Sequence, residues 1–254
     1  MRPAPIARRL ALLCLVVLVV TPVAAGAAEV RLIATNAVKD SVREVVSAFE
    51  RASGHTVVTV WSGTEAIAKR IRDGEVFDLV LIAAPNIDQL IADGKLATGS
   101  RTDYAKSGVG VAVRRGLPKP DISTGDAVKR AVLAANSVAY SSGPSGFYLA
   151  ELFKKMGIAE QIKDKVRQPP SGAQVGDLLA RGEADLGFQQ VSELIHVQGI
   201  DYLGPLPADI QNITTFSIGL QVSAPASDAA KALVKALCSP EARSFITKAG
   251  MEPA

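Results

Sequence analysis

The stretch VAYSSGPSGFYLAELFKKMG, residues 138–157, passes from a short apolar strand pattern to an amphipathic helix pattern through one short connection. That connection, 141–146, contains only Ser, Gly and Pro. Such a junction can be an ordinary tight turn, or it can present the free backbone N–H groups of a helix N-terminus to a ligand. The pattern of the rest of the chain bears on both interpretations.

Strand and helix patterns alternate along the whole chain. Apolar runs that predict buried strands occur at 30–35, 55–61, 77–84, 137–142 and 184–190, with segments of helical apolar spacing between them. The run at 77–84, FDLVLIAA, has almost no polar alternation, which is typical of a parallel strand covered on both faces. Two further apolar runs, 109–115 and 214–222, are placed to cross between lobes. The sequence therefore predicts an α/β protein.

The N-terminal residues 1–27 have the layout of a secretory signal peptide. A basic start is followed by an apolar run at 10–20 and by a small-residue exit at 25–27. The run is short for a membrane span, and no later segment approaches the roughly 20 apolar residues that a span needs. We therefore expect a periplasmic protein with no membrane span after removal of 1–27.

Charge and cysteine content exclude several partner classes. The three arginines of 1–27 account for the formal net charge of +3, so the remaining chain is neutral and offers no basic surface for nucleic acid. Cys14 lies in the same segment, which leaves Cys238 without a disulfide partner. Neither histidine has a second metal ligand at a useful spacing, and no phosphate-loop signature occurs. We expect no metal and no cofactor.

Four strand-to-helix junctions carry hydroxyl groups or glycines, at 35–37, 61–64, 141–148 and 171–173. Gln189 and Gln190 add amides at the end of a further strand. In open parallel sheets, ligands bind beyond the carboxyl ends of the strands, where neutral N–H and O–H donors suit an anion. The alternative interpretation is that these residues are ordinary N-caps, because Ser, Thr and Gly prefer those positions without any ligand.

Several segments resemble the periplasmic molybdate-binding proteins of ABC transporters. These segments are AFERASGHTVVTVWSGTEAIAKRIRDGEVFDLVLIA, LIADGKL, SGFYLAELFKKMGI, LLARGEADLGFQQ and ALCSPEARSFITKAGMEP, which together cover nearly all of the chain after 1–27. The resemblance implies a two-lobe periplasmic solute-binding fold with mixed, mostly parallel sheets and a ligand cleft between the lobes. Lobe 1 is expected to comprise 28–105 and 215–254, and lobe 2 to comprise 106–214. We expect a monomer that binds a small anion and passes it to an ABC permease.

The residues at the binding positions of that family differ here from the molybdate pattern. Asn36 and Ala37 stand where the resemblance implies a serine, Thr64 replaces a second serine, and Gln190 replaces a tyrosine. These changes favour a planar or larger carboxylate, with Gln189 and Gln190 as donors. The expected ligand-binding residues are Asn36, Ala37, Ser62, Thr64, Ser145, Gly146, Gly172, Gln189 and Gln190.

A second function is also implied by resemblance. The segments YSSGPSG and GFQQVSEL look closer to a divergent branch of this fold that includes an exported aconitate isomerase. Such an enzyme interconverts cis- and trans-aconitate by moving a proton across an allylic system, which requires carboxylate anchors and an acid/base group. Tyr148, Glu193 and Lys39 are the candidates for that group. The chain is thus expected to be a solute-binding protein for a small carboxylate or oxyanion, with the isomerase as the alternative.

Overall fold

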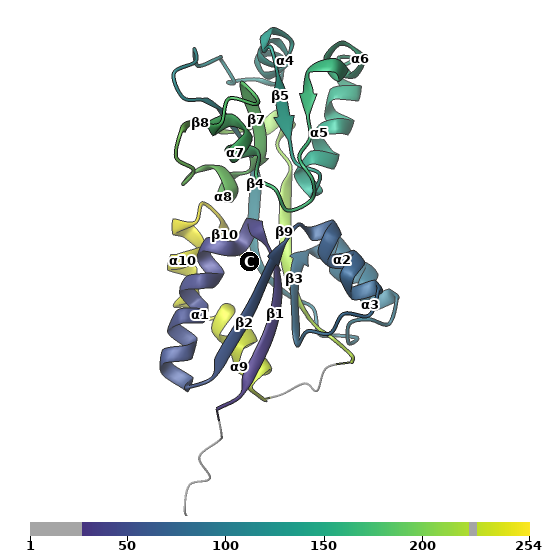
Figure 1. The fold of residues 1–254 in the computed structure, drawn as a ribbon, viewed down its shortest axis with the longest axis vertical. Helices are drawn as coiled ribbons and strands as arrows, with labels where there is room; N and C mark the ends of the chain where they lie inside the picture. Colours follow the sequence, from purple (N-terminus) through teal and green to yellow (C-terminus); the bar gives the residue numbers. More distant parts are fainter. Residues whose placement is uncertain (1–26, 224–227) are drawn as a thin grey trace, which may run out of the picture.

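The structure is a computed structural model that describes residues 27–223 and 228–254. Two lobes, one above the other in Figure 1, are connected by β4 (Thr102–Arg114) and β9 (Ile213–Leu220). Within the described ranges, no helix has the length and apolar character that crossing a membrane requires. The expected signal peptide falls almost wholly outside the described residues.

The first lobe is built on three parallel strands. β1 (Glu29–Thr35) lies between β2 (Thr56–Ser62) and β3 (Leu79–Ala83), and β9 adds an antiparallel neighbour to β3. Helices cover both faces of this sheet (Figure 1). One face holds α1 (Lys39–Ser53), α9 (Asp228–Leu237) and α10 (Ala242–Lys248), and the other holds α2 (Thr64–Arg72) and α3 (Ala84–Ala92).

The apolar run at 77–84 forms β3, a strand parallel to β1 and covered on both faces, as its composition predicted. Along β3, Leu79 and Leu81 pack against the α1 side, whereas Val80 and Ile82 pack against the α2 side. All four side chains are fully buried. A strand whose alternate side chains enter two different cores has no solvent-facing position, which explains the absence of polar alternation.

The second lobe repeats this plan with shorter strands. β5 (Val138–Tyr140) lies in parallel between β6 (Val166–Arg167) and β7 (Leu186–Gln190), and β4 pairs antiparallel with β7 and with β8 (Ile200–Pro205). One face is covered by α4 (Gly125–Ala134), α5 (Pro144–Lys155) and α6 (Ala159–Ile162). The other is covered by α7 (Val175–Ala180) and α8 (Val191–Leu194). The remaining short elements are η1 (Asn36–Val38), η2 (Lys163–Lys165), η3 (Ala208–Ile210) and β10 (Glu252–Pro253).

The two predicted crossing strands are confirmed, and β4 is longer than its apolar run. Up to Gly108 it pairs with β9, and from Val109 onward it pairs with β7. One continuous sheet path therefore runs through both lobes. The crossing strands β4 and β9 run antiparallel to their neighbours. The sheet is mixed, as expected, but it contains more antiparallel strand pairs than a mostly parallel sheet would.

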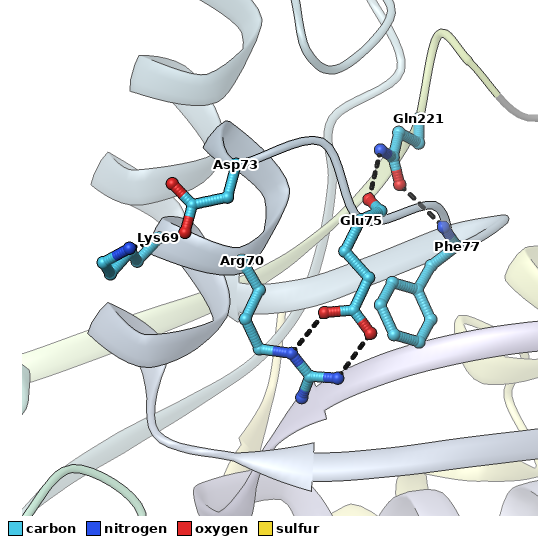
Figure 2. Close-up of polar contacts among 6 residues, drawn as sticks. All are labelled: Lys69, Arg70, Asp73, Glu75, Phe77 and Gln221. Carbon is cyan, nitrogen blue, oxygen red and sulfur yellow. Dashed lines mark hydrogen bonds and ion pairs between the residues drawn. The ribbon is translucent and has the colours of Figure 1, made fainter.

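Gln221 ties the connection between α2 and β3 to the end of β9 (Figure 2). Its side-chain oxygen accepts a hydrogen bond from the Phe77 backbone N–H at 2.8 Å, and its Nε2 donates to the Glu75 carbonyl oxygen at 2.8 Å. The Gln221 side chain is buried. Arg70 and Glu75 form a two-pronged ion pair beside it, in which both side chains are more than a third exposed.

We expect Gln221→Ala to lower the free energy of unfolding by about 2 to 3 kcal/mol, because it leaves the buried Phe77 N–H without an acceptor. Arg70→Met is the matched control, since it removes an exposed ion pair and should cost less than about 1 kcal/mol. Urea unfolding of both variants measures the difference. Equal losses would show that the buried amide contributes no more to this connection than the exposed ion pair.

Candidate functional site

A cavity of about 40 Å³ lies between the two lobes. Its walls include the carboxyl ends of β1 and β7 and the connections that follow β2, β5 and β6. All four hydroxyl- and glycine-rich junctions of the sequence contribute lining residues. The topology therefore collects segments that are far apart in the chain around one small space.

Most of the expected ligand-binding residues line this cavity. They are Asn36, Ala37, Thr64, Ser145, Gly172, Gln189 and Gln190. Ser62 ends β2 just before the lining segment and is not among the lining residues. Gly146 is also outside the lining: a Cβ there would lie 1.5 Å from the Ser141 carbonyl oxygen, so glycine permits the start of α5 to pack on Ser141. Gly146 thus helps to place its neighbour Ser145.

The helix N-termini at the cavity lack side-chain caps. α2 follows Gly63 and α5 follows Gly143, and neither first turn has a capping hydrogen bond from a side chain at its N-cap position. By contrast, α4 lies away from the cavity and is capped by Thr124, whose Oγ1 accepts from the Ala127 N–H at 3.1 Å. α3 and α10 also lack a side-chain cap at their N-cap positions, but the first residues of α2 and α5 line the cavity, where uncapped first-turn N–H groups are available to a ligand.

Thr64, the first residue of α2, lines the cavity with a hydroxyl group that lacks a protein partner. The residue is only 2% exposed, and within the described ranges its Oγ1 has no hydrogen-bond partner. Burying an unpaired hydroxyl costs about 1 to 3 kcal/mol. The Thr64 hydroxyl is therefore a further polar group that the cavity can offer to a ligand, in addition to the helix N-termini.

Gln190 is held by the crossing strands. Its amide oxygen accepts from the Thr214 hydroxyl at 2.9 Å, which places its nitrogen 3.0 Å from the Ser107 carbonyl oxygen and 3.2 Å from that of Gly108. Gln211 acts beside it: its Oε1 accepts from the Val109 N–H at 2.8 Å, and its Nε2 donates to the Val109 carbonyl at 3.1 Å. Both glutamines thus bind β4 where it changes its partner strand.

Gln189 is held at the start of α7. Its oxygen accepts from the Val175 N–H at 2.8 Å, and its nitrogen donates to the Gln174 side-chain oxygen at 3.1 Å. The amides of Gln189 and Gln190, which we expected to bind ligand, are therefore engaged with protein atoms. The sequence could not show these contacts, because each depends on the tertiary positions of other segments.

Glu193 is the one titratable side chain among the described residues that line the cavity. The residue as a whole is partly buried, but its carboxyl group is desolvated, and this burial raises the pKa of Glu193 to about 7. Hydrogen bonds to the side chains of Gln174 and Gln189 and to the Gln190 backbone lower the pKa and offset part of the rise. Near neutral pH, Glu193 can therefore either donate or accept a proton.

The other two acid/base candidates lie elsewhere. The Tyr148 hydroxyl donates to the Ile210 carbonyl oxygen at 2.7 Å, and Tyr148 is not a lining residue. Lys39 begins α1 and is also outside the lining. Phe216 on β9 does line the cavity, although its sequence context is that of any core residue in an apolar strand.

The cavity has no basic side chain. None of its described lining residues is Lys, Arg or His. Across the described part of the chain, no group of three His, Cys, Asp or Glu residues could hold a metal ion. The donors offered to a ligand are backbone N–H groups and hydroxyls, together with Glu193 when it is protonated.

The two lobes touch directly at the edge of the cavity. The Asn36 side-chain nitrogen, in the first lobe, donates to the Gly172 carbonyl oxygen in the second lobe at 2.7 Å. Gly63 meets the same segment: a Cβ there would lie 2.2 Å from Ser171 Oγ and 2.7 Å from the Gly172 nitrogen. Gly172 has φ +92°, a backbone conformation that favours glycine. The structure is thus a closed arrangement that requires glycine on both sides.

Comparisons with known proteins agree with this geometry. The profile of a family described as bacterial extracellular solute-binding protein matches residues 30–252. An aconitate isomerase of a Pseudomonas species is 38% identical over 227 residues, which is 87% of this chain and 86% of that protein. A molybdate-binding protein of Azotobacter vinelandii is 30% identical over 175 residues, covering 67% of this chain and 68% of that protein. The solved periplasmic molybdate-binding protein of A. vinelandii superposes with a TM-score of 0.75 at 19% identity, covering 87% of this chain and 98% of that one.

We expect Gly63→Ala to hold the lobes apart, because the new methyl group would collide with Ser171 and Gly172. Small-angle X-ray scattering should then give a larger radius of gyration than for the unchanged protein. The control is Gly143→Ala at the equivalent position before α5, where a Cβ meets nothing closer than 4.0 Å. If both variants scatter like the unchanged protein, the closed contact does not exist in solution.

Proposed function

We propose that this chain, which belongs to the family of bacterial extracellular solute-binding proteins, binds a small carboxylate or oxyanion in the cavity between its lobes. The observation that carries the proposal is the buried, unpartnered Thr64 hydroxyl beside uncapped helix N-termini. Oriented N–H dipoles and hydroxyls stabilise negative charge without a basic side chain. The cavity volume of about 40 Å³ favours a small solute over a polymer.

The proposal extends to the place and the partner of the protein. Segment 1–27 directs export to the periplasm, the lobes 28–105 with 215–254 and 106–214 close on the anion, and the monomer passes it to an ABC permease. Its support is the extracellular family description and the change of sheet partners at Gly108 and Val109, close to the proposed lobe boundary.

We expect Thr64→Val to weaken anion binding by roughly tenfold, because the anion loses one hydroxyl donor, without loss of thermal stability. A thermal-shift scan of molybdate, tungstate, sulfate and di- and tricarboxylates selects the anion, and titration calorimetry measures its affinity. Thr124→Val is the matched control: it removes the α4 cap, should cost about 1 kcal/mol of stability, and should leave affinity unchanged. An unchanged affinity in Thr64→Val would remove this hydroxyl from the binding site.

Glu193 favours a second candidate function, an aconitate isomerase on the same scaffold. An isomerase needs an ionisable group that can both take and return a proton. The relative that is 38% identical over most of both chains carries that name. Glu193 lines the cavity and has a pKa raised by burial to about 7, which suits a group that both takes and returns a proton.

The proton shift needs no second reactant. Ionised Glu193 takes a proton from the methylene carbon of cis-aconitate, and the electron pair of that C–H bond spreads over the three-carbon allylic unit. The protonated Glu193 then returns the proton to the carbon at the other end of the unit. The double bond moves, trans-aconitate forms, and Glu193 is ionised again.

We expect Glu193→Gln to abolish the conversion of cis- to trans-aconitate, which is measured by chromatography. Binding of the tricarboxylate should remain measurable by calorimetry. Gln keeps the size of the side chain but cannot accept the proton. Glu44→Gln, on the exposed face of α1, is the control and should convert normally. Absence of conversion by the unchanged protein would leave the binding function alone, and full conversion by Glu193→Gln would exclude Glu193 as the proton carrier.

A further inference from the structure

We propose that the cavity takes up its anion together with one proton held on Glu193, so that binding weakens as the solution becomes more alkaline. The inference rests on the proposed anion-binding function, and it applies to the binding protein, because an isomerase needs an ionised Glu193 beside its bound substrate. In this inference, the protonation state of Glu193 determines whether the cavity accepts a ligand.

The composition of the cavity carries the first step. Glu193 shares the cavity with the unpartnered Thr64 hydroxyl and the start of α5, and no described lining residue is basic. An ionised Glu193 would therefore meet the anion with no positive side chain to offset the repulsion. A protonated carboxyl group instead adds an O–H donor to a set of neutral donors.

The position of Glu193 carries the second step. Glu193 lies on α8, which directly follows the strand that contains Gln189. The Gln189 side chain is fixed by the Val175 N–H and by the Gln174 side chain. The contact between Asn36 and Gly172 joins the lobes at the edge of the cavity. Glu193 therefore lines a wall of the cavity next to a fixed strand end, and adding a proton removes its charge without moving the side chain.

The elements around α8 carry other ionisable groups, but none of these is a described lining residue of the cavity. The helix packs against β4, β7, β8, α7 and η1. The ionisable groups on or next to these elements are Lys39, Asp40, Arg101, Asp103, Tyr104, Lys106, Arg114, Arg115, Asp177, Arg181, Asp185, Asp201 and Tyr202. His196 lies just beyond α8, and its ring nitrogen is 3.1 Å from the Lys248 carbonyl oxygen.

The direction of the pH dependence follows from linkage. Burial raises the pKa of Glu193 to about 7 in the ligand-free protein. At pH 6.5, the group is mostly protonated already, so the anion binds with little proton uptake. At pH 8 it is mostly ionised, and binding must take up about one proton from solution. The apparent affinity should therefore fall roughly eightfold between pH 6.5 and pH 8.

Titration calorimetry with sulfate, molybdate and tricarballylate tests this inference. Tricarballylate is a saturated tricarboxylate with no allylic system, so turnover cannot disturb the measurement. At pH 8, heats in HEPES and in Tris should differ by the amount that corresponds to about one proton taken up. Glu193→Gln should bind at pH 8 as tightly as at pH 6.5, because its side chain is always neutral, and the exposed Glu44→Gln should keep the full pH dependence.

The outcomes separate this inference from the proposed function. If none of the three anions binds at either pH, the anion-binding function fails and the inference fails with it. If one binds equally at both pH values, with the same heat in both buffers, the function stands and the inference is overturned. A pH dependence that persists in Glu193→Gln also overturns it, because the proton then resides on another group. The measurements on the unchanged protein decide the question even if the variant does not fold.

Discussion

The peptide groups of β4 at Ser107, Gly108 and Val109 must satisfy hydrogen bonds while the strand passes from one sheet to the other. Buried backbone donors and acceptors without partners are costly. The Leu206 N–H donates to the Val109 carbonyl at 2.8 Å, and two side chains add further partners here. Gln190 binds the carbonyls of Ser107 and Gly108, and Gln211 binds both polar groups of Val109. Because Gln190 also lines the cavity, the joint between the lobes and the wall of the site share one residue.

The site is likewise built from a small number of polar groups. Its donors are first-turn backbone groups and small hydroxyls, which carry no net charge and need no counterion when the cavity is empty. Against this neutral background, a single carboxyl group dominates the local electrostatics. Glu193 is held by the Gln174 and Gln189 amides, and the loss of hydration, not a charged neighbour, is the largest influence on its pKa. A site of this kind responds to protons more than to salt.

The fold could be predicted from the strand pattern. The contacts inside the site were much harder to predict from the sequence. Runs such as 77–84 and 109–115 specify buried strands because 79–84 and 109–113 within them carry no polar side chain, whereas β8, with Asp201, Tyr202 and Gly204, has no such signal. The rule that ligands lie beyond strand ends predicted which junctions meet. It could not assign partners to the Gln189 and Gln190 amides, which contact groups 14 to 83 positions away, and it could not distinguish Glu193 from a solvated surface acid. Nothing in the sequence distinguishes Phe216 from other apolar core residues, because only its position beside the cavity sets it apart.

The hydroxyl of Thr64 is a buried polar group of the cavity that has no protein partner among the described residues. On the proposed function, a bound anion adds stability that grows with the logarithm of its concentration above the Kd, since it binds the folded chain and not the unfolded one. Proteases degrade the open or unfolded fraction of a protein, so occupancy also determines how long each molecule survives. The abundance of this protein outside the cytoplasm would then follow the supply of its own solute, without any change in gene expression.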